Sequence, residues 1–333
     1  MPDNPLPATR RLDAARDADV AEAVRLLRDG RLVAVPTETV YGLAADATNP
    51  AAVRRIFAAK GRPSNHPLIV HLGDPAWLDA WARDVPDAAR RLAAAFWPGP
   101  LTLLLHKAAA APGEVTGGRD TIGLRMPDHP VLLRVLRALG HGVAAPSANP
   151  YKRLSPTTAD QVLAGLDGRI DAVLDGGPCA VGLESTIVDL TGDTPRILRA
   201  GPITRRQLED ALGVAVEFPG SHDAAVPGNV AVHYQPRTPL HVLATDTLRA
   251  RLDALPAGAR IALLAHTPDL PAHGVALRIA MPHDKAGYAR TLYDALHTAD
   301  AAGVDAIWLE RPPSDEDWRD VHDRLSRAAQ SGG

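Results

Sequence analysis

Residues 216–239 divide the sequence into two parts. The stretch EFPGSHDAAVPGNVAVHYQPRTP within them holds four prolines and shows neither helical nor strand periodicity, which is typical of a linker or a long loop. A chain of 333 residues is long enough for two domains. We therefore predict an N-terminal arm at 1–14, a large domain at 15–215, a linker or lid at 216–239 and a small domain at 240–330.

Both parts mix helical and strand patterns. An amphipathic helix is predicted at 18–30 and a buried strand at 31–36, and similar segments follow as far as 212. Consecutive strand patterns late in this part favour a mixed α/β sheet over a purely parallel one. After residue 240, strands and helices alternate over about 90 residues, which predicts a small doubly wound α/β domain.

The composition excludes several classes of protein. The net charge is −3 with both signs interspersed, which gives no support to a strongly basic nucleic-acid-binding surface. The single cysteine, Cys179, excludes an internal disulfide and a multi-cysteine metal site. No apolar leader and no apolar run of about 18 residues is present, so we expect a soluble, cytoplasmic protein without a membrane segment.

The familiar catalytic signatures are absent. The chain has no GxxxxGK[ST], GxGxxG, HExxH, GxSxG or CxxC motif, so an ordinary P-loop NTPase, a zincin and an α/β-hydrolase have no support. Function must be sought in scattered polar residues instead.

Lys60 is one such residue, because lysine occurs only at positions 60, 107, 152 and 285. The preceding stretch predicts a helix at 50–60, with Asn49 as its N-cap and Gly61 past its end. A cation in the last turn of a helix is ordinary capping chemistry. This stretch alone leaves a structural and a functional interpretation of Lys60 open.

Other polar residues follow apolar runs, where loop side chains often face a site. Thr121 and Arg125 share a face if their stretch is a strand. Ser147 and Asn149 lie among small residues that let a ligand approach the backbone. Turns, caps and solvated strand edges account for each group taken singly. The remaining members are Thr37, Glu38, Thr39, His71, Ser155, Glu184, Ser185, Thr186 and Arg199.

Each of these motifs is too short to identify a family by itself, but their order along the chain is specific. PTETVYGL, KGRP, PLIVH, TIGLRMP, APSAN, SPTTA, ESTIVD, ILRAG and PG…HY.P follow one another, and the series closely resembles the threonylcarbamoyl-AMP synthase family. The resemblance runs from about residue 15 to 240, and the rest resembles the C-terminal domain of the long, two-domain form. It implies the mixed-sheet catalytic fold of that family.

The resemblance also implies a reaction. Family members join L-threonine and bicarbonate to ATP, release pyrophosphate and supply L-threonylcarbamoyl-AMP to the machinery that modifies tRNA. Lys60 and Arg62 match the catalytic cations that serve the phosphates, with Mg²⁺ expected alongside ATP. The matching threonine positions are Thr39, His71, Arg125 and Ser185. The matching ATP positions are Arg62, Thr121, Ser147, Ser155, Arg199 and Tyr234. Asn149, in the same motif as Ser147, and His66, after KGRP, are added to the expected nucleotide contacts.

The sequence departs from the family pattern in three places. Asn65 and His66 stand where Asp-Asn is frequent, so the nucleotide contact falls to His66 or shifts to Asn65. Ala145 replaces a frequent threonine, so a hydroxyl contact is lost there. The linker differs from the usual SPGM at Val226 and Asn229.

Two rival functions remain open from the sequence. One is a double-stranded-RNA-binding module on the same fold, which the near-neutral charge does not favour. The other is a transferase that uses carbamoyl phosphate, as in hydrogenase maturation, but one cysteine cannot make the zinc-finger segments of those proteins. The sequence leaves open the oligomeric state, the role of the C-terminal domain, direct tRNA binding and the transfer partner.

Overall fold

The computed structural model describes residues 8–219, 222, 224, 226–228, 233–271 and 273–329. These residues form two compact units. The first unit takes in the described residues up to Tyr151, then Pro156–Ala180, and those from Glu184 to Gly228. The second takes in Lys152–Ser155, Val181–Leu183 and the described residues from 233 onward. Two short segments of the predicted large domain thus belong to the second unit.

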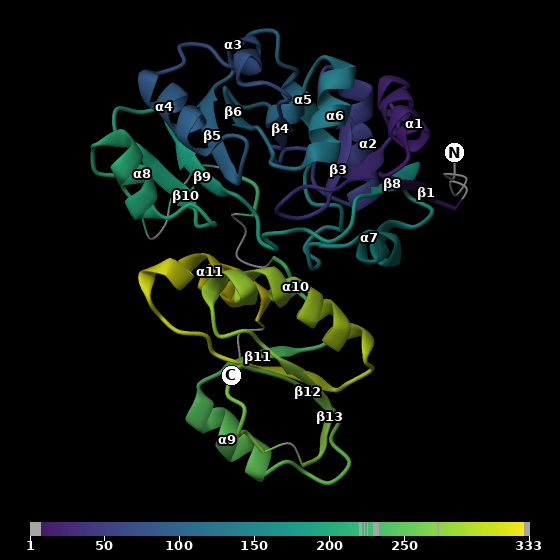
Figure 1. Ribbon diagram of the computed structural model, residues 1–333, viewed down its shortest axis with the longest axis vertical. Helices are drawn as coiled ribbons and strands as arrows, with labels where there is room; N and C mark the ends of the chain where they lie inside the picture. Colours follow the sequence, from purple (N-terminus) through teal and green to yellow (C-terminus); the bar gives the residue numbers. More distant parts are fainter. Residues whose placement is uncertain are drawn as a thin grey trace. The chain divides into compact units, whose positions relative to one another are not determined.

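The first unit contains a ten-stranded sheet in the order β1-β8-β2-β3-β7-β4-β6-β5-β9-β10 (Figure 1). Parallel and antiparallel pairs are mixed, which confirms the predicted mixed α/β sheet. The strands are β1 (Arg10–Asp13), β2 (Val33–Val35), β3 (Gly42–Asp46), β4 (Ile69–His71), β5 (Leu101–His106), β6 (Thr121–Arg125), β7 (Val143–Ala144), β8 (Ala172–Asp175), β9 (Thr186–Asp189) and β10 (Arg196–Arg199).

Helices connect these strands, and their ends follow from local sequence. In α2 the side chain of Asn49 accepts hydrogen bonds from the first turn, and Gly61 ends the helix at φ 64°. The helix at 50–60 was therefore predicted correctly. The helices are α1 (Asp17–Arg28), α2 (Pro50–Lys60), α3 (Leu78–Trp81), α4 (Asp87–Phe96), α5 (Gly113–Thr116), α6 (Pro130–Leu139), α7 (Ala159–Leu166) and α8 (Arg205–Leu212), with a 3₁₀ turn η1 (Pro75–Trp77).

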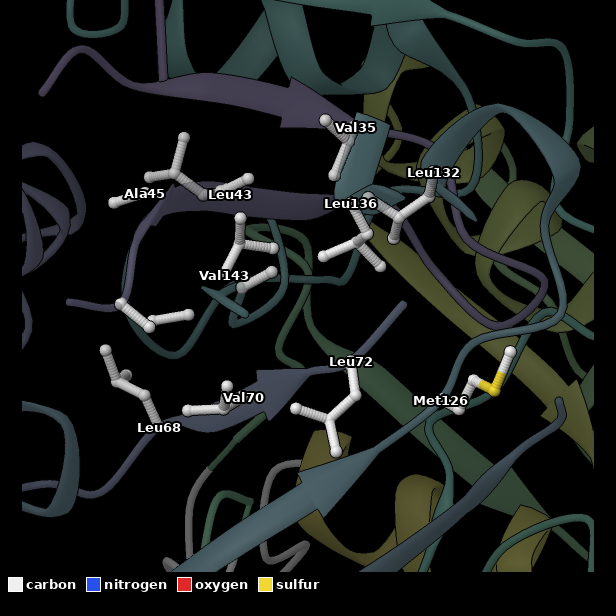
Figure 2. Packing of buried hydrophobic residues seen from close by; sticks show 14 of the residues in the cluster. Val35, Leu43, Ala45, Leu68, Val70, Leu72, Met126, Leu132, Leu136 and Val143 are labelled. Atoms are coloured by element: carbon white, nitrogen blue, oxygen red, sulfur yellow. The ribbon is translucent and has the colours of Figure 1, made fainter. Parts of the chain in front are cut away.

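The sheet has two different faces. Val70 of β4 packs into the main core with Val35, Leu43 and Leu136 (Figure 2). Its neighbour Ile69 belongs to a separate small cluster with Leu104, Ile187, Leu198 and Val226. Successive side chains in a strand point to opposite faces, so the small cluster marks the second face. The described linker residue Val226 packs on that second face.

The second unit is a parallel four-stranded sheet in the order β11-β14-β12-β13. Helix α9 lies on one face of it, and α10 and α11 lie on the other (Figure 1). The predicted small doubly wound domain is confirmed. The elements are β11 (Leu240–Leu243), α9 (Thr245–Asp253), β12 (Ile261–Ala265), β13 (Val275–Ala280), α10 (Lys285–Ala301), β14 (Ala306–Glu310), η2 (Glu316–Trp318) and α11 (Arg319–Ala328).

In the part of the chain that the structure describes, every helix is too short or too polar to cross a membrane.

Candidate functional site

Polar side chains line up across the second face of the large sheet. His71 at the end of β4 pairs in register with Arg125 at the end of β6. Thr102 of β5 pairs with Ile187 of β9, and Ile187 pairs with Arg199 of β10. Strand register therefore places two arginines and a histidine, which are far apart in the sequence, along one line of the sheet.

Arg125 joins the end of β6 to the loop that follows β2. Its Nη2 donates to Thr39 Oγ1 at 3.0 Å and lies 2.6 Å from Glu38 Oε1. Arg125 and Glu38 expose only 4% and 5% of their side chains. In a buried ion pair, the attraction between the charges offsets the free-energy cost of desolvation only if their geometry is good. The loop after β2 thus supplies both a hydroxyl and a carboxylate to the arginine of β6.

The loop 37–40 is held by its own threonine. Thr37 Oγ1 accepts from the backbone N–H groups of Thr39 (3.1 Å) and Val40 (3.2 Å), and it lies 2.6 Å from the Val40 carbonyl oxygen, to which it donates. This turn fixes the backbone at Thr39 and directs its hydroxyl toward Arg125. The turn expected at Thr37 is present, and Thr39 stays a predicted site residue whose hydroxyl accepts from Arg125.

His71 is buried beside the same arginine. Burial, and then the positive charge of Arg125, lower the pKa of His71 well below its ordinary value. The imidazole is therefore neutral near pH 7. Its Nδ1 has no hydrogen-bond partner within the described residues, so it can donate to or accept from a small bound molecule, depending on the tautomer.

Ser185 and Arg199 form a second cluster on this face. Arg199 donates to the backbone oxygen of Ser185 (Nε, 2.9 Å) and to its hydroxyl (Nη2, 3.0 Å). The same hydroxyl lies 2.7 Å from Thr102 Oγ1. Arg199 Nη1 also donates to the carbonyl of Pro227 at 2.9 Å, so one guanidinium joins β9, β10 and the described part of the linker.

Lys60 does not cap its own helix. It is 3% exposed, and its ammonium donates to the backbone oxygens of Ser147 (2.6 Å) and Asn149 in the loop after β7. Burial, followed by the charge of Arg62, lowers the pKa of Lys60 well below its ordinary value. Lys60 therefore holds the APSAN loop from within, next to Arg62.

The same loop runs along the chain around residue 42. The backbone N–H of Leu43 donates to the Pro146 oxygen at 2.7 Å, and that of Ala148 donates to the Tyr41 oxygen at 2.8 Å. Ser147 is half-buried and Asn149 is buried. The loop thus follows the strand edge, with Lys60 beneath it.

The KGRPSNH stretch supplies further groups near this loop. Arg62 is buried and donates to the oxygen of Pro67 at 3.0 Å. The ring of His66 lies edge-on to Tyr151 at 5.6 Å, whereas Asn65 is exposed. Thr121 is half-buried at the start of β6 and shares the face of Arg125.

Two of the predicted nucleotide residues belong to the second unit. Ser155 is fully buried and its backbone oxygen accepts from His297 at 3.1 Å. Tyr234 has a backbone φ of 60°. Its ring centroid lies 5.9 Å from that of Tyr293 and 5.5 Å from Cζ of Arg324, whose guanidinium lies over the ring. All the other predicted site residues lie in the first unit. Asn229, at which the linker differs from the family pattern, lies outside the described residues.

Two site residues were not predicted as such from the sequence. Glu38 stood in a motif that was noticed, but its part in the ion pair with Arg125 depends on a contact across the sheet. Thr102 is the one polar residue in the apolar run LTLLL, and that interruption was its only local signal. Cys179 is buried, and burial raises the pKa of its thiol to about 12, so the thiol stays protonated and unreactive near neutral pH.

The arrangement suits a small anionic ligand that carries hydroxyl or amino groups. Arg125 and Arg199 offer planar donors to carboxylate or phosphate oxygens. Thr39, Ser185 and His71 add neutral donors and acceptors. Among the residues with described side chains, no group of three or more His, Cys, Asp or Glu could hold a metal ion.

Two family profiles match the chain. Residues 25–201 match the Sua5/YciO/YrdC family, described as telomere recombination. Residues 203–330 match the domain described as threonylcarbamoyl-AMP synthase, C-terminal domain. Together they cover most of both compact units.

Curated proteins and solved structures agree with these profiles. The threonylcarbamoyl-AMP synthase of Bacillus subtilis is 38% identical over 330 residues, which cover 95% of this chain and 94% of the relative. That of Pyrococcus abyssi is 37% identical, with 86% and 87% covered. The crystal structure of P. abyssi Sua5 complexed with L-threonine superimposes with a TM-score of 0.87 at 33% identity, covering 96% of this chain and 97% of that one.

Proposed function

The chain belongs to the threonylcarbamoyl-AMP synthase family, and we propose that it makes L-threonylcarbamoyl-AMP from L-threonine, bicarbonate and ATP, with release of pyrophosphate. In this reaction the nitrogen of threonine bonds to the carbon of bicarbonate, water is lost, and a carbamate forms. A carbamate oxygen then attacks the α-phosphorus of ATP, and the bond to the pyrophosphate oxygen breaks. The adenylate would supply the machinery that modifies tRNA in the cytoplasm. As the nucleotide is transferred, the enzyme is a nucleotidyltransferase.

The observation that carries the proposal is the buried group around Arg125. A guanidinium with Thr39 and a neutral His71 beside it suits a carboxylate and a hydroxyl on one small molecule. The relative from P. abyssi was crystallised with L-threonine. We propose that threonine lies here, with its carboxylate on Arg125 and with Ser185 as a further contact.

ATP is proposed to lie beside this group. Lys60 and Arg62 would offset the charge that moves to the leaving pyrophosphate. Lys60 also holds the loop of Ser147 and Asn149, so it would act both on the charge and on the shape of the nucleotide site. His66, Thr121 and Arg199 complete the proposed nucleotide set of the first unit, and Ser155 and Tyr234 of the second unit remain predicted nucleotide residues.

Mg²⁺ is proposed to arrive with ATP rather than to reside in the protein. Mg²⁺ usually keeps several waters and binds substrate phosphates with one or two carboxylates. The carboxylate of Glu38 is already paired with Arg125, and no group of metal-ligating side chains occurs in the described part of the chain. When bound, Mg²⁺ would neutralise phosphate charge.

The linker is proposed to be a lid. Part of it lies on the second face, where Val226 packs with Ile69 and Leu104, and Pro227 accepts from Arg199. A cover in this position would exclude water from the labile carbamate and adenylate.

The test is to incubate the protein with ATP, Mg²⁺, bicarbonate and one amino acid, and to measure pyrophosphate and the adenylate. We expect threonine to be strongly preferred over serine, valine and glycine. Valine should be rejected more sharply than serine, because a site built to pair a hydroxyl penalises its loss more than that of a methyl group. Equal pyrophosphate release with all four would overturn the proposal.

A further inference from the structure

The ion pair between Glu38 and Arg125 has unfilled hydrogen-bonding capacity. Glu38 Oε1 lies 2.6 Å from Arg125 Nη2 in the ion pair, but neither Oε1 nor Oε2 has a hydrogen-bond partner within the described residues. The same is true of Arg125 Nε. All three atoms are buried, and buried polar atoms are almost always paired in a folded protein. Open acceptors and an open donor on the two partners of one buried ion pair therefore point to a bound molecule.

The open atoms belong to groups of opposite charge, the Glu38 carboxylate and the Arg125 guanidinium, which limits the chemistry of the bound molecule. Arg125 can take an anionic oxygen, and Glu38 can take a cationic or neutral N–H donor. An α-amino acid carries a carboxylate and an ammonium group on the same carbon. The adjacent cation and anion of the protein match the adjacent anion and cation of the ligand.

Glu38 is the anion of this group. His71 is neutral, because burial and the charge of Arg125 lower its pKa. The thiol of Cys179, which lies close enough to feel the charges of both Glu38 and Arg125, is also neutral, because burial raises its pKa to about 12. An ammonium group bound here has Glu38 as its charged partner.

We infer that Glu38 is a substrate-binding residue that receives the α-amino group of threonine while Arg125 receives its carboxylate. The inference rests on the proposed function and deepens it, because it assigns the amino group to a residue outside the predicted threonine set. It also gives the site a basis for selecting amino acids over other carboxylic acids. Glu38 then orients the nitrogen that must bond to the carbon of bicarbonate.

The test compares two ligands by calorimetry without ATP. One is L-threonine and the other is its α-hydroxy analogue, in which a hydroxyl group replaces the amino group. The wild-type protein should bind threonine at least about tenfold more tightly, because a hydrogen bond to a charged group is lost in the analogue. Equal affinities would overturn the inference and leave the threonine proposal standing.

Glu38→Gln keeps the shape and removes the charge. Threonine affinity should fall about 10–100-fold, while the affinity of the analogue changes by less than about threefold. If Glu38 only held Arg125 in place, both ligands would weaken together, and that result overturns the inference. Arg125→Lys is the matched variant for the carboxylate, and it should weaken both ligands.

A second variant guards against failure of the first to fold. Glu38→Asp keeps the negative charge one methylene shorter, and it should keep the preference for the amino compound, whereas loss of that preference would count against the inference. A wild-type protein that binds neither ligand overturns the proposed function and this inference with it. A wild-type protein that binds serine but not threonine, with the same dependence on the amino group, overturns the threonine proposal alone.

Discussion

At the scale of single residues, Lys60 shows that a position typical of a helix-capping residue can serve a contact elsewhere in the fold. A lysine in the last turn of α2 suits a helix C-terminus, but its ammonium reaches across to the loop of Ser147 and Asn149. Capping alone would let arginine replace it. The buried contact with the loop requires lysine, because the guanidinium of arginine is larger and planar.

Lys60→Arg should therefore lose stability as well as turnover. Forcing the larger group into a buried space costs about 1–3 kcal/mol. Urea unfolding gives the free energy, and pyrophosphate release gives turnover. Lys107→Arg is the control, since Lys107 is only half-buried, and it should be close to wild type. A Lys60→Arg protein as stable as wild type would show that the contact with the loop does not require lysine.

His71 should make the stability depend on pH. Its pKa is lowered in the folded state, while an unfolded histidine titrates near about 6.5. Below that pH the unfolded chain takes up a proton that the folded protein refuses, so stability falls as the pH drops toward the folded pKa. The slope approaches about 1.4 kcal/mol per pH unit for one group.

His71→Asn should reduce this loss, as measured by urea unfolding at several pH values between about 7.5 and 5. His129 and His297, whose pKa values burial also lowers, should account for part of the remainder. The exposed His273 is the control, and His273→Asn should leave the curve unchanged. A His71→Asn protein with the wild-type slope would contradict the prediction.

At the scale of elements, the linker and the sheet act together. Strand alternation leaves an apolar strip on the second face, formed by Ile69, Leu104, Ile187 and Leu198, and Val226 covers it. Arg199 and the Leu198 carbonyl add polar contacts to Pro227 and His222, the latter at 2.8 Å. The described linker residues are thus held to the sheet by both apolar and polar groups.

Val226→Ala should loosen this contact while leaving the core intact. We expect faster limited proteolysis between residues 216 and 239 and a lower yield of intact adenylate, with the melting temperature nearly unchanged. Val216→Ala is the matched control, because Val216 belongs to the main core. It should lower the melting temperature without the proteolytic signature. Identical behaviour of the two variants would mean that Val226 only contributes general packing.

At the scale of the whole molecule, the two units are not separated at one point of the chain. Lys152–Ser155 and Val181–Leu183 belong to the second unit, although both precede the linker. Gly182 (φ 86°) shows how closely one of them packs there, since a Cβ at that position would lie 2.5 Å from the Cα of Arg290 in α10. The predicted boundary at 215 assigns both segments to the large domain, whereas they belong to the second unit.

A fragment that ends at Leu212 should therefore be less stable than the intact protein, because it keeps these two segments but lacks the rest of the second unit. Leu154 and Leu183 are buried in the intact protein, and each would lose about 1.5–3 kcal/mol of burial. We expect a lower melting temperature and binding of a hydrophobic dye. Replacing both leucines with serine in the fragment should reduce the dye signal. A fragment that binds no dye would indicate that the two segments refold onto the first unit.

The sequence by itself determined the elements and the family. The helix at 50–60, the mixed sheet, the small parallel domain and the series of motifs all depend on local periodicity, caps and order along the chain, which are short-range properties. The position of Thr121 and Arg125 on one face also followed from alternation within a single strand.

Only the tertiary structure decided which of these residues meet. Arg125 and Thr39 are 86 positions apart, and Lys60 and Ser147 are 87 positions apart. Their contacts come from the order and register of ten strands, which no local pattern encodes. Glu38 became part of the site, and Ser155 part of the second unit, for the same reason. The sequence gives the chemistry of each side chain, but the order and register of the strands determine which side chains come into contact.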